Sequence, residues 1–265
     1  MSRRGAGWSL LLAGPPLLFV LVFFGWPVAA IIAAGLAPGG ALDLAPLLET
    51  LGAPFVREVA WFTLWQAVVS TLLTVVLALP GAYAFARFDF PAKRLLGALA
   101  IVPFVLPTVV VAAAFLALLG PRSPLVHSIW VILAAHVFYN YAIVLRLVGG
   151  AWAQLDPRLV DAARMLGASR WRAFREVTWP LLRPAVASAS SIVFLFTFTS
   201  FGVILLLGGP RFATLEVEIY RQVAQLLDLP AAAALALLQM AALLALLLAY
   251  ARTQERLAVS LRPVA

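Results

Sequence analysis

Six long apolar runs alternate with short segments that carry most of the charge. A helix needs roughly 20 mostly apolar residues to cross a bilayer, and each run is of that order of length. The runs are continuous rather than alternating, so they predict helices and not the strands of a barrel. We therefore predict an all-α polytopic membrane protein whose residues 1–265 form a single transmembrane domain. The predicted spans are about 10–34, 59–85, 95–119, 125–148, 185–207 and 231–251.

Composition supports the membrane assignment. The chain is 64% hydrophobic and 11% charged, and a soluble domain could not bury so much apolar surface. There is no cysteine, which excludes disulfides, zinc–thiolate sites and thiol catalysis. The first apolar run follows Arg3 and Arg4, as in a signal peptide. It is longer than a signal core of about 7–15 residues, so we expect it to be retained as the first span.

The basic residues are distributed unevenly between the two sides of the predicted membrane domain. One side carries fifteen of the nineteen Lys and Arg residues with five of the eleven acids, a net charge of +10, and the other side carries −2. Cytoplasmic loops hold the excess of Lys and Arg, so we place the first side and both termini in the cytoplasm. The overall charge of +8 thus indicates orientation in the cell (inner, cytoplasmic) membrane. We expect contact with membrane lipid and none with nucleic acid.

Polar side chains recur on single helical faces inside three of the spans. In the second span four polar residues follow a spacing of i, i+3, i+7 and i+11, and such a stripe is costly toward lipid. Two interpretations stay open for these faces, namely hydrogen bonding between helices and the lining of a translocation path. A lone histidine such as His136 favours the former, and neither a second histidine nor a carboxylate lies near it in sequence to form a metal site. The candidate path residues are Thr63, Gln66, Ser70, Thr74, His136, Tyr139, Asn140, Ser191, Thr197 and Ser200.

Two absences limit the possible energy sources. No Asp, Glu, Lys or Arg falls in the middle of a predicted span, which disfavours a proton-driven carrier. No phosphate-binding loop occurs, and Lys93 is the only lysine. We predict that the chain is not an enzyme, binds no cofactor of its own, and that any energy for active transport comes from another chain. In the third span, Pro103 and Pro107 predict either a static kink or a gate.

The loop 156–180 is basic and has a helix–glycine–helix pattern. Asp156 is a good cap for a short amphipathic helix that ends at Gly167, and Ser169 can cap a second segment. We predict that the first segment docks on a soluble partner, because its small residues allow close approach. The alternative is a helix that lies on lipid headgroups. We expect the second, basic and aromatic segment to rest on the membrane surface before Trp179 and Pro180 return the chain to the bilayer.

This loop resembles the signature loop of ABC importer permeases of the type I fold, whose pattern is E-A-A-x3-G-x9-I-x-L-P. The chain has Asp161-Ala162-Ala163, Gly167, Val177 and Trp179-Pro180 at matching spacing, with Asp for Glu, Val for Ile and Trp for Leu. The resemblance implies a type I transmembrane domain with a cytoplasmic coupling helix between spans four and five. The residues it implies for docking to the ATPase are Asp161, Ala162, Ala163, Leu166, Gly167 and Ala168.

Further stretches narrow the resemblance. Residues 133–140, 200–203, 207–210 and 214–220 look like the amino-terminal half of thiamine-type permeases, which are related to ferric-iron permeases. Those proteins usually carry two six-helix halves, so the chain is expected to be a half-length relative that forms a homodimer or heterodimer, or half of a fused permease.

The resemblance implies a binding-protein-dependent importer for a thiamine-like organic cation or ferric iron. Its expected partners are ABC ATPase subunits with ATP and Mg, a periplasmic or lipid-anchored substrate-binding protein, and a second permease half. The alternatives are a stand-alone secondary carrier or channel and a non-transporting membrane scaffold.

Overall fold

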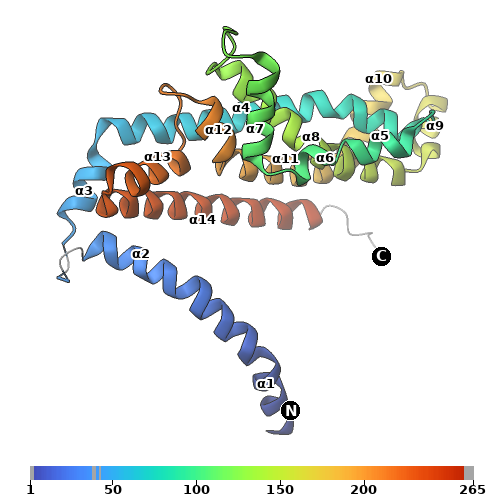
Figure 1. Ribbon diagram of the computed structural model, residues 1–265. Coiled ribbons are helices and arrows are strands. Elements are labelled where there is room, and N and C mark those ends of the chain that lie inside the picture. The colour runs from blue at the N-terminus through green and yellow to red at the C-terminus, as the bar shows by residue number, and fades with distance from the viewer. Residues whose placement is uncertain (1–2, 38–39, 42, 260–265) are drawn as a thin grey trace. The chain divides into compact units, whose positions relative to one another are not determined.

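The computed structural model describes residues 3–37, 40–41 and 43–259, and these contain helices and no strand (Figure 1). Part of the predicted charge count, and both ends of the chain, fall on residues 1–2 and 260–265 outside the described range. The α-helices are α1 (Arg3–Val20), α2 (Trp26–Leu36), α3 (Ala45–Gly52), α4 (Pro54–Arg87), α5 (Lys93–Leu99), α6 (Val102–Val105), α7 (Thr108–Leu119), α8 (Ile129–Gln154), α9 (Pro157–Met165), α10 (Arg170–Ala173), α11 (Trp179–Phe198), α12 (Gly202–Leu207), α13 (Leu215–Arg221) and α14 (Leu229–Val259). Three π-helical turns join neighbouring helices, namely η1 (Leu21–Gly25), η2 (Phe174–Thr178) and η3 (Gln222–Leu226).

Six membrane spans follow from these helices when one bent pair is counted as a single span. The described residues hold five continuous candidates: Leu12–Ala33, Pro54–Arg87, Ile129–Gln154, Arg170–Phe198 and Leu229–Arg252. The sixth is the pair Lys93–Val105 and Thr108–Leu119, which is bent by 104°. The predicted number of spans and the all-α class are therefore confirmed.

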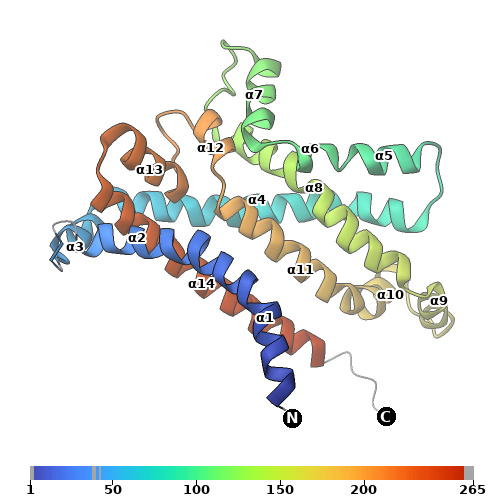
Figure 2. The same cartoon turned by 60° about the horizontal axis from the view of Figure 1, so that its bottom comes forward.

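The third predicted span is broken rather than kinked (Figure 2). Its break lies at Leu106, whose backbone is extended with ψ 145°. A residue before proline is pushed out of the helical region by the proline ring, so Pro107 accounts for the conformation of Leu106. Pro107 is a predicted kink position, but the continuous apolar run gives no indication of a bend as large as 104°.

The fifth predicted span, 185–207, has wrong bounds at both ends. Its helical run starts at Arg170 and ends at Phe198, and α12 is a separate helix. At the carboxyl end, Thr199 leaves the helical region with ψ 27°, in a run of hydroxyl side chains that compete for backbone hydrogen bonds. At the amino end, Pro180 follows η2, and such a turn accommodates a residue without an amide donor. The segment expected to lie on the membrane surface is thus continuous with the helix of this span, and its contact with the surface stays a prediction.

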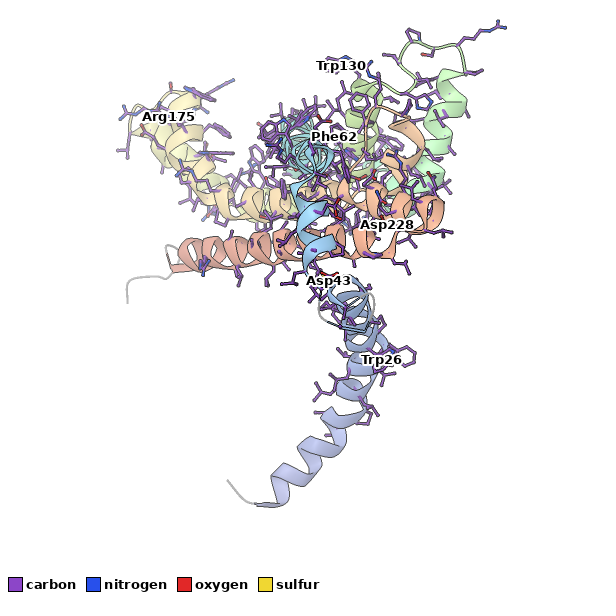
Figure 3. All side chains as sticks on the ribbon, turned by 90° about the vertical axis from the view of Figure 1, so that its left-hand side faces the viewer. Trp26, Asp43, Phe62, Trp130, Arg175 and Asp228 are labelled. Atoms are coloured by element: carbon purple, nitrogen blue, oxygen red, sulfur yellow. The ribbon has the colours of Figure 1, made fainter. Side chains whose placement is uncertain are left out.

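The chain forms two compact units, which are described separately. The first comprises residues 1–57 and 218–242. In it Leu12–Ala33 has no buried side chain, and Trp26 is 75% exposed (Figure 3). Glu218 is buried, with an oxygen 2.9 Å from the guanidinium of Arg221.

The second unit comprises residues 58–217 and 243–265 and is built around α8. α11 packs along α8 (Figure 2), and α12 packs against α7. Two hydrophobic clusters form its core. One, which includes Val144, Val148 and Leu182, lies toward the loop 156–180, which we call the arginine-rich loop. The other includes Phe62, whose ring centroid is 5.3 Å from that of Phe212 (Figure 3).

The contact between α4 and α8 depends on a glycine and gives a test of the packing. A methyl group on Gly149 would lie 3.4 Å from the carbonyl oxygen of Ala82, whereas one on Gly150 would have no neighbour within 4 Å. We expect Gly149→Leu to push the helices apart and cost about 1–3 kcal/mol of unfolding free energy. Gly150→Leu should be neutral or stabilise by up to about 1 kcal/mol through helix propensity. Thermal unfolding of both variants in detergent measures this, and equal midpoints would contradict the packing.

Candidate functional site

The polar face of α4 is fully buried. Thr63, Gln66, Ser70 and Thr74 each have 0% of their surface exposed. The hydroxyl of Thr74 donates to the carbonyl of Ser70 over 2.7 Å, within its own helix. The stripe thus faces neighbouring helices and not lipid, as its spacing predicts.

His136 connects this face to α8 and to the end of α11. Its Nδ1 lies 2.9 Å from Ser70 Oγ, and its Nε2 lies 2.8 Å from Ser200 Oγ. A neutral imidazole has one donor and one acceptor nitrogen, so one serine hydroxyl accepts from the ring and the other donates to it. One turn further on, the side-chain amide of Asn140 donates to the carbonyl of His136 over 2.9 Å. Both ring nitrogens of His136 are thus engaged, one with Ser70 of α4 and the other with Ser200 after the end of α11.

The same side chains satisfy backbone groups near the break between α11 and α12. Gln66 Nε2 donates to the carbonyl of Thr197 over 2.8 Å. The hydroxyl of Thr214 donates to the carbonyl of Ser200 over 2.9 Å. The amide of Leu215 donates to Thr63 Oγ1 over 3.0 Å. Backbone polar groups inside a bilayer need partners within the protein, and this set of side chains supplies them.

We call this set the polar core. It brings together eight of the ten candidate path residues and adds Thr214, which the sequence analysis missed because it is an isolated hydroxyl in a connection. Its members are Thr63, Gln66, Ser70, Thr74, His136, Asn140, Thr197, Ser200 and Thr214. The geometry supports hydrogen bonding between helices as one role of these residues.

Two candidates lie apart from the polar core. The ring of Tyr139 is 5.5 Å from that of Phe104. Ser191 donates to its own helix at Ala187 and lines a largely apolar pocket of about 380 Å³ with Thr71. That any of the ten touches a substrate stays a prediction. Within the described residues, no three of His, Cys, Asp and Glu lie close enough together to hold a metal ion.

Two buried amide oxygens in the polar core accept no hydrogen bond from any described residue. They are Oε1 of Gln66 and Oδ1 of Asn140. Buried polar atoms are usually satisfied, so these two are the acceptors of the polar core that are open to water or to another donor.

The arginine-rich loop has the predicted helix–glycine–helix form. Asp156 caps α9 by accepting from the amide of Arg158 over 2.9 Å. Gly167 has φ +88°, and the amide of Ala168 reaches back to the carbonyl of Ala163 over 3.1 Å. Ser169 Oγ then accepts from the amide of Arg172 over 3.2 Å and starts the next helical run.

The end of α9 presents bare apolar side chains. Met165 is 89% exposed and Leu166 is 90% exposed, the largest values among the exposed large hydrophobic residues of the described chain. Of the other predicted docking residues, Asp161, Ala162 and Gly167 are also exposed, and Ala163 and Ala168 are half-buried. Both apolar side chains lie outside the candidate membrane spans, so burial in the hydrocarbon core of a bilayer does not account for their exposure. Exposed apolar groups in such a place mark an interaction surface.

Comparison with known families accounts for this loop and its spans. The family model of binding-protein-dependent transport system inner membrane components matches residues 70–258. The chain belongs to this family. The match includes the polar core from Ser70 onward and all of the arginine-rich loop.

Individual relatives within the family differ in what they are named for. The chain is 34% identical over 228 residues to a thiamine transport system permease protein of Brucella abortus (strain 2308), which covers 80% of the chain and 41% of the relative. The corresponding protein of Escherichia coli (strain K12) is 32% identical over 219 residues, 77% of the chain and 41% of the relative. A molybdate/tungstate transport system permease protein of Thermococcus kodakarensis is 30% identical over 188 residues, 71% of the chain and 73% of the relative. The chain thus spans about two fifths of the length of the thiamine permeases it matches.

Solved structures agree on the fold. A chain of a bacterial ABC transporter involved in the import of alginate superposes with a TM-score of 0.78 at 17% identity, covering 96% of both chains. A chain of a methionine ABC transporter in an inward-facing conformation gives 0.61 at 16% identity, covering 80% of this chain and 98% of that one. At these identities the likeness shows the fold, that of a type I ABC importer transmembrane domain, and nothing of the substrate.

The hydrogen bond between Ser70 and His136 can be measured by a double-mutant cycle. We expect Ser70→Ala and His136→Phe to show a coupling of about 1 kcal/mol in unfolding free energy, as for hydrogen bonds between membrane helices. As a control, Ser190→Ala should combine additively with His136→Phe. Ser190 lies ten residues before Ser200, on the order of 15 Å along the helix. If the effects of both pairs are additive, the hydrogen bond between Ser70 and His136 does not contribute to stability, and the prediction is wrong.

Proposed function

We propose that the chain is the permease subunit of an ATP-driven, binding-protein-dependent importer, and that α9 is its coupling helix. The observation that carries this proposal is the pair of bare apolar side chains, Met165 and Leu166, at the end of a short capped helix outside the spans. A soluble ATPase with an apolar groove would cover them. The proposed docking residues are Asp161, Ala162, Ala163, Leu166, Gly167 and Ala168.

The helices next to α9 suggest how a movement of the ATPase reaches the interior of the membrane. After Gly167 and Ser169 the chain enters one helical run of 29 residues, Arg170–Phe198. A displacement of α9 would move this helical run as a rigid body. The run ends at Phe198, next to Thr197 and Ser200 of the polar core. In this proposal the helices rock between outward-facing and inward-facing states. ATP binding supplies the differential contacts that such coupling needs.

The proposed cargo is a thiamine-like organic cation, with ferric iron as the second choice. Relatives named for thiamine transport support the first choice, as does the net charge of −2 on the predicted outer side, which favours a cation over an oxyanion. The proposed partners are an ABC ATPase that holds ATP and Mg, a substrate-binding protein on the outer side, and a second permease half. The chain would have no ATPase site of its own and both termini in the cytoplasm. A second half would complete the path, since the chain matches only part of the thiamine permeases.

Loss of the apolar tip of α9 should uncouple the chain from its ATPase without unfolding it. Leu166→Ser removes a side chain that is 90% exposed, so folding should be unaffected. Burial of a leucine contributes about 1.5–3 kcal/mol, so we expect ATPase association to weaken by about tenfold or more. Leu118→Ser, at the far end of α7 and 83% exposed, is the matched control and should keep full association. Equal association of both variants would refute the docking role of α9.

The cargo is tested by reconstitution with an ABC ATPase and a substrate-binding protein that bind this chain. We expect ATP-dependent uptake of radiolabelled thiamine into proteoliposomes and no uptake of molybdate. Uptake of molybdate would show that the cargo is an oxyanion and not an organic cation. Uptake without the ATPase would favour a stand-alone carrier, and no uptake by the complete system would favour a scaffold.

A further inference from the structure

A charged cavity of about 560 Å³ lies behind α9 in the second unit. Its volume falls within the roughly 300–1,000 Å³ of small-molecule sites. Three guanidinium groups line it from three different helices: Arg87 at the end of α4, Arg164 in α9 and Arg170 at the start of α10. One carboxylate, Asp161, lines it as well, so the cavity carries an excess of positive charge.

The three arginines have no ion-pair partner in the described chain. The ion pairs found there join Lys93 to Asp89, Arg172 to Glu176 and Arg221 to Glu218. Of the three cavity arginines, Arg87 makes one long hydrogen bond, 3.4 Å, to the carbonyl of Leu155. Unpaired guanidinium groups that converge on one cavity form a site for an anion, and their planar donors suit phosphate oxygens.

The remaining walls place the cavity at the membrane boundary. Tyr83 and Trp152 line it from the last turns of α4 and α8, with their ring centroids 5.1 Å apart. Tyrosine and tryptophan side chains are typical of the level of the lipid headgroups. The cavity opens on the arginine-rich side, which is the predicted cytoplasmic side. Basic pockets between membrane helices on that side bind acidic lipid headgroups.

We propose that this cavity binds a phosphate group, supplied by the headgroup of an anionic phospholipid or by soluble phosphate. The bound phosphate bridges Arg87 of α4 to Arg164 of α9 and Arg170 of α10. It thereby fixes α9 against the end of α4. Asp161 opposes binding, because its carboxylate faces the same cavity. The proposal needs neither an ATPase nor a substrate, so it stands or falls independently of the proposed function.

The experiment measures phospholipid binding to the purified full chain by native mass spectrometry, with phosphatidylglycerol against phosphatidylcholine. Each cavity arginine near the surface contributes about 1 kcal/mol, or about fivefold. We therefore expect Arg164→Gln/Arg170→Gln to weaken phosphatidylglycerol binding by about 25-fold and to leave phosphatidylcholine unchanged. Arg164→Lys/Arg170→Lys should retain part of the affinity, and Asp161→Asn should increase it.

The charge-matched control is Arg158→Gln/Arg175→Gln, which removes two exposed arginines from the same loop that do not line the cavity. It should retain the binding of the unmodified chain. An equal loss in the control would reduce the effect to general surface charge and overturn the proposal. So would a cavity variant that binds phosphatidylglycerol as tightly as the unmodified chain.

The source of the phosphate is decided by competition. If inorganic phosphate displaces phosphatidylglycerol and slows hydrogen exchange in α9 of the lipid-free chain, and both effects require Arg164 and Arg170, soluble phosphate is the ligand. If inorganic phosphate has no effect while phosphatidylglycerol binds through these arginines, the headgroup is the ligand. Absence of binding by both would overturn the proposal.

Discussion

The second unit depends on one constraint, the need to satisfy backbone groups where a membrane span is broken. The helix of the fifth span ends at Phe198, inside a run of apolar residues. Carbonyls near such a break cannot turn to water, and each unsatisfied group costs several kcal/mol in a bilayer. The side chains of α4 meet this need at Thr197 and at Leu215. The polar stripe of α4 thus supplies the hydrogen bonds that the break requires. The position of the stripe along α4 therefore fixes where α11 packs against it.

A second broken span lies next to the first. Gly202, the first residue of α12, lies against Thr108 and Val109, the first residues of α7. α7 itself begins at the break that Pro107 imposes. The two breaks therefore meet, and the helices beyond them, α7 and α12, pack against each other and against α8.

Sequence patterns predicted what depends on local chemistry and missed what depends on tertiary contact. The number of spans, the cap at Asp156 and the left-handed Gly167 follow from hydrophobic length and from known preferences at helix ends. The end of the fifth span was missed, because hydropathy is equally high before and after Thr199. The face of the α4 stripe could be predicted, but not its partners. Thr214 is far from α4 in sequence and has no periodic neighbours, so no sequence pattern indicates its place in the polar core.

The arginine-rich loop illustrates a limit of charge counting. An excess of arginine on one side of a membrane protein indicates orientation, and each arginine contributes equally to such a count. The structure distinguishes them: Arg172 is held by Glu176, whereas Arg87, Arg164 and Arg170 converge on a cavity. Orientation requires only that the charges lie near the ends of the spans, and so leaves their exact positions free. Arginines that bind a ligand can also lie near the ends of the spans. A count of arginines in the sequence therefore cannot separate ligand binding from membrane orientation, whereas their convergence on one cavity in the structure can.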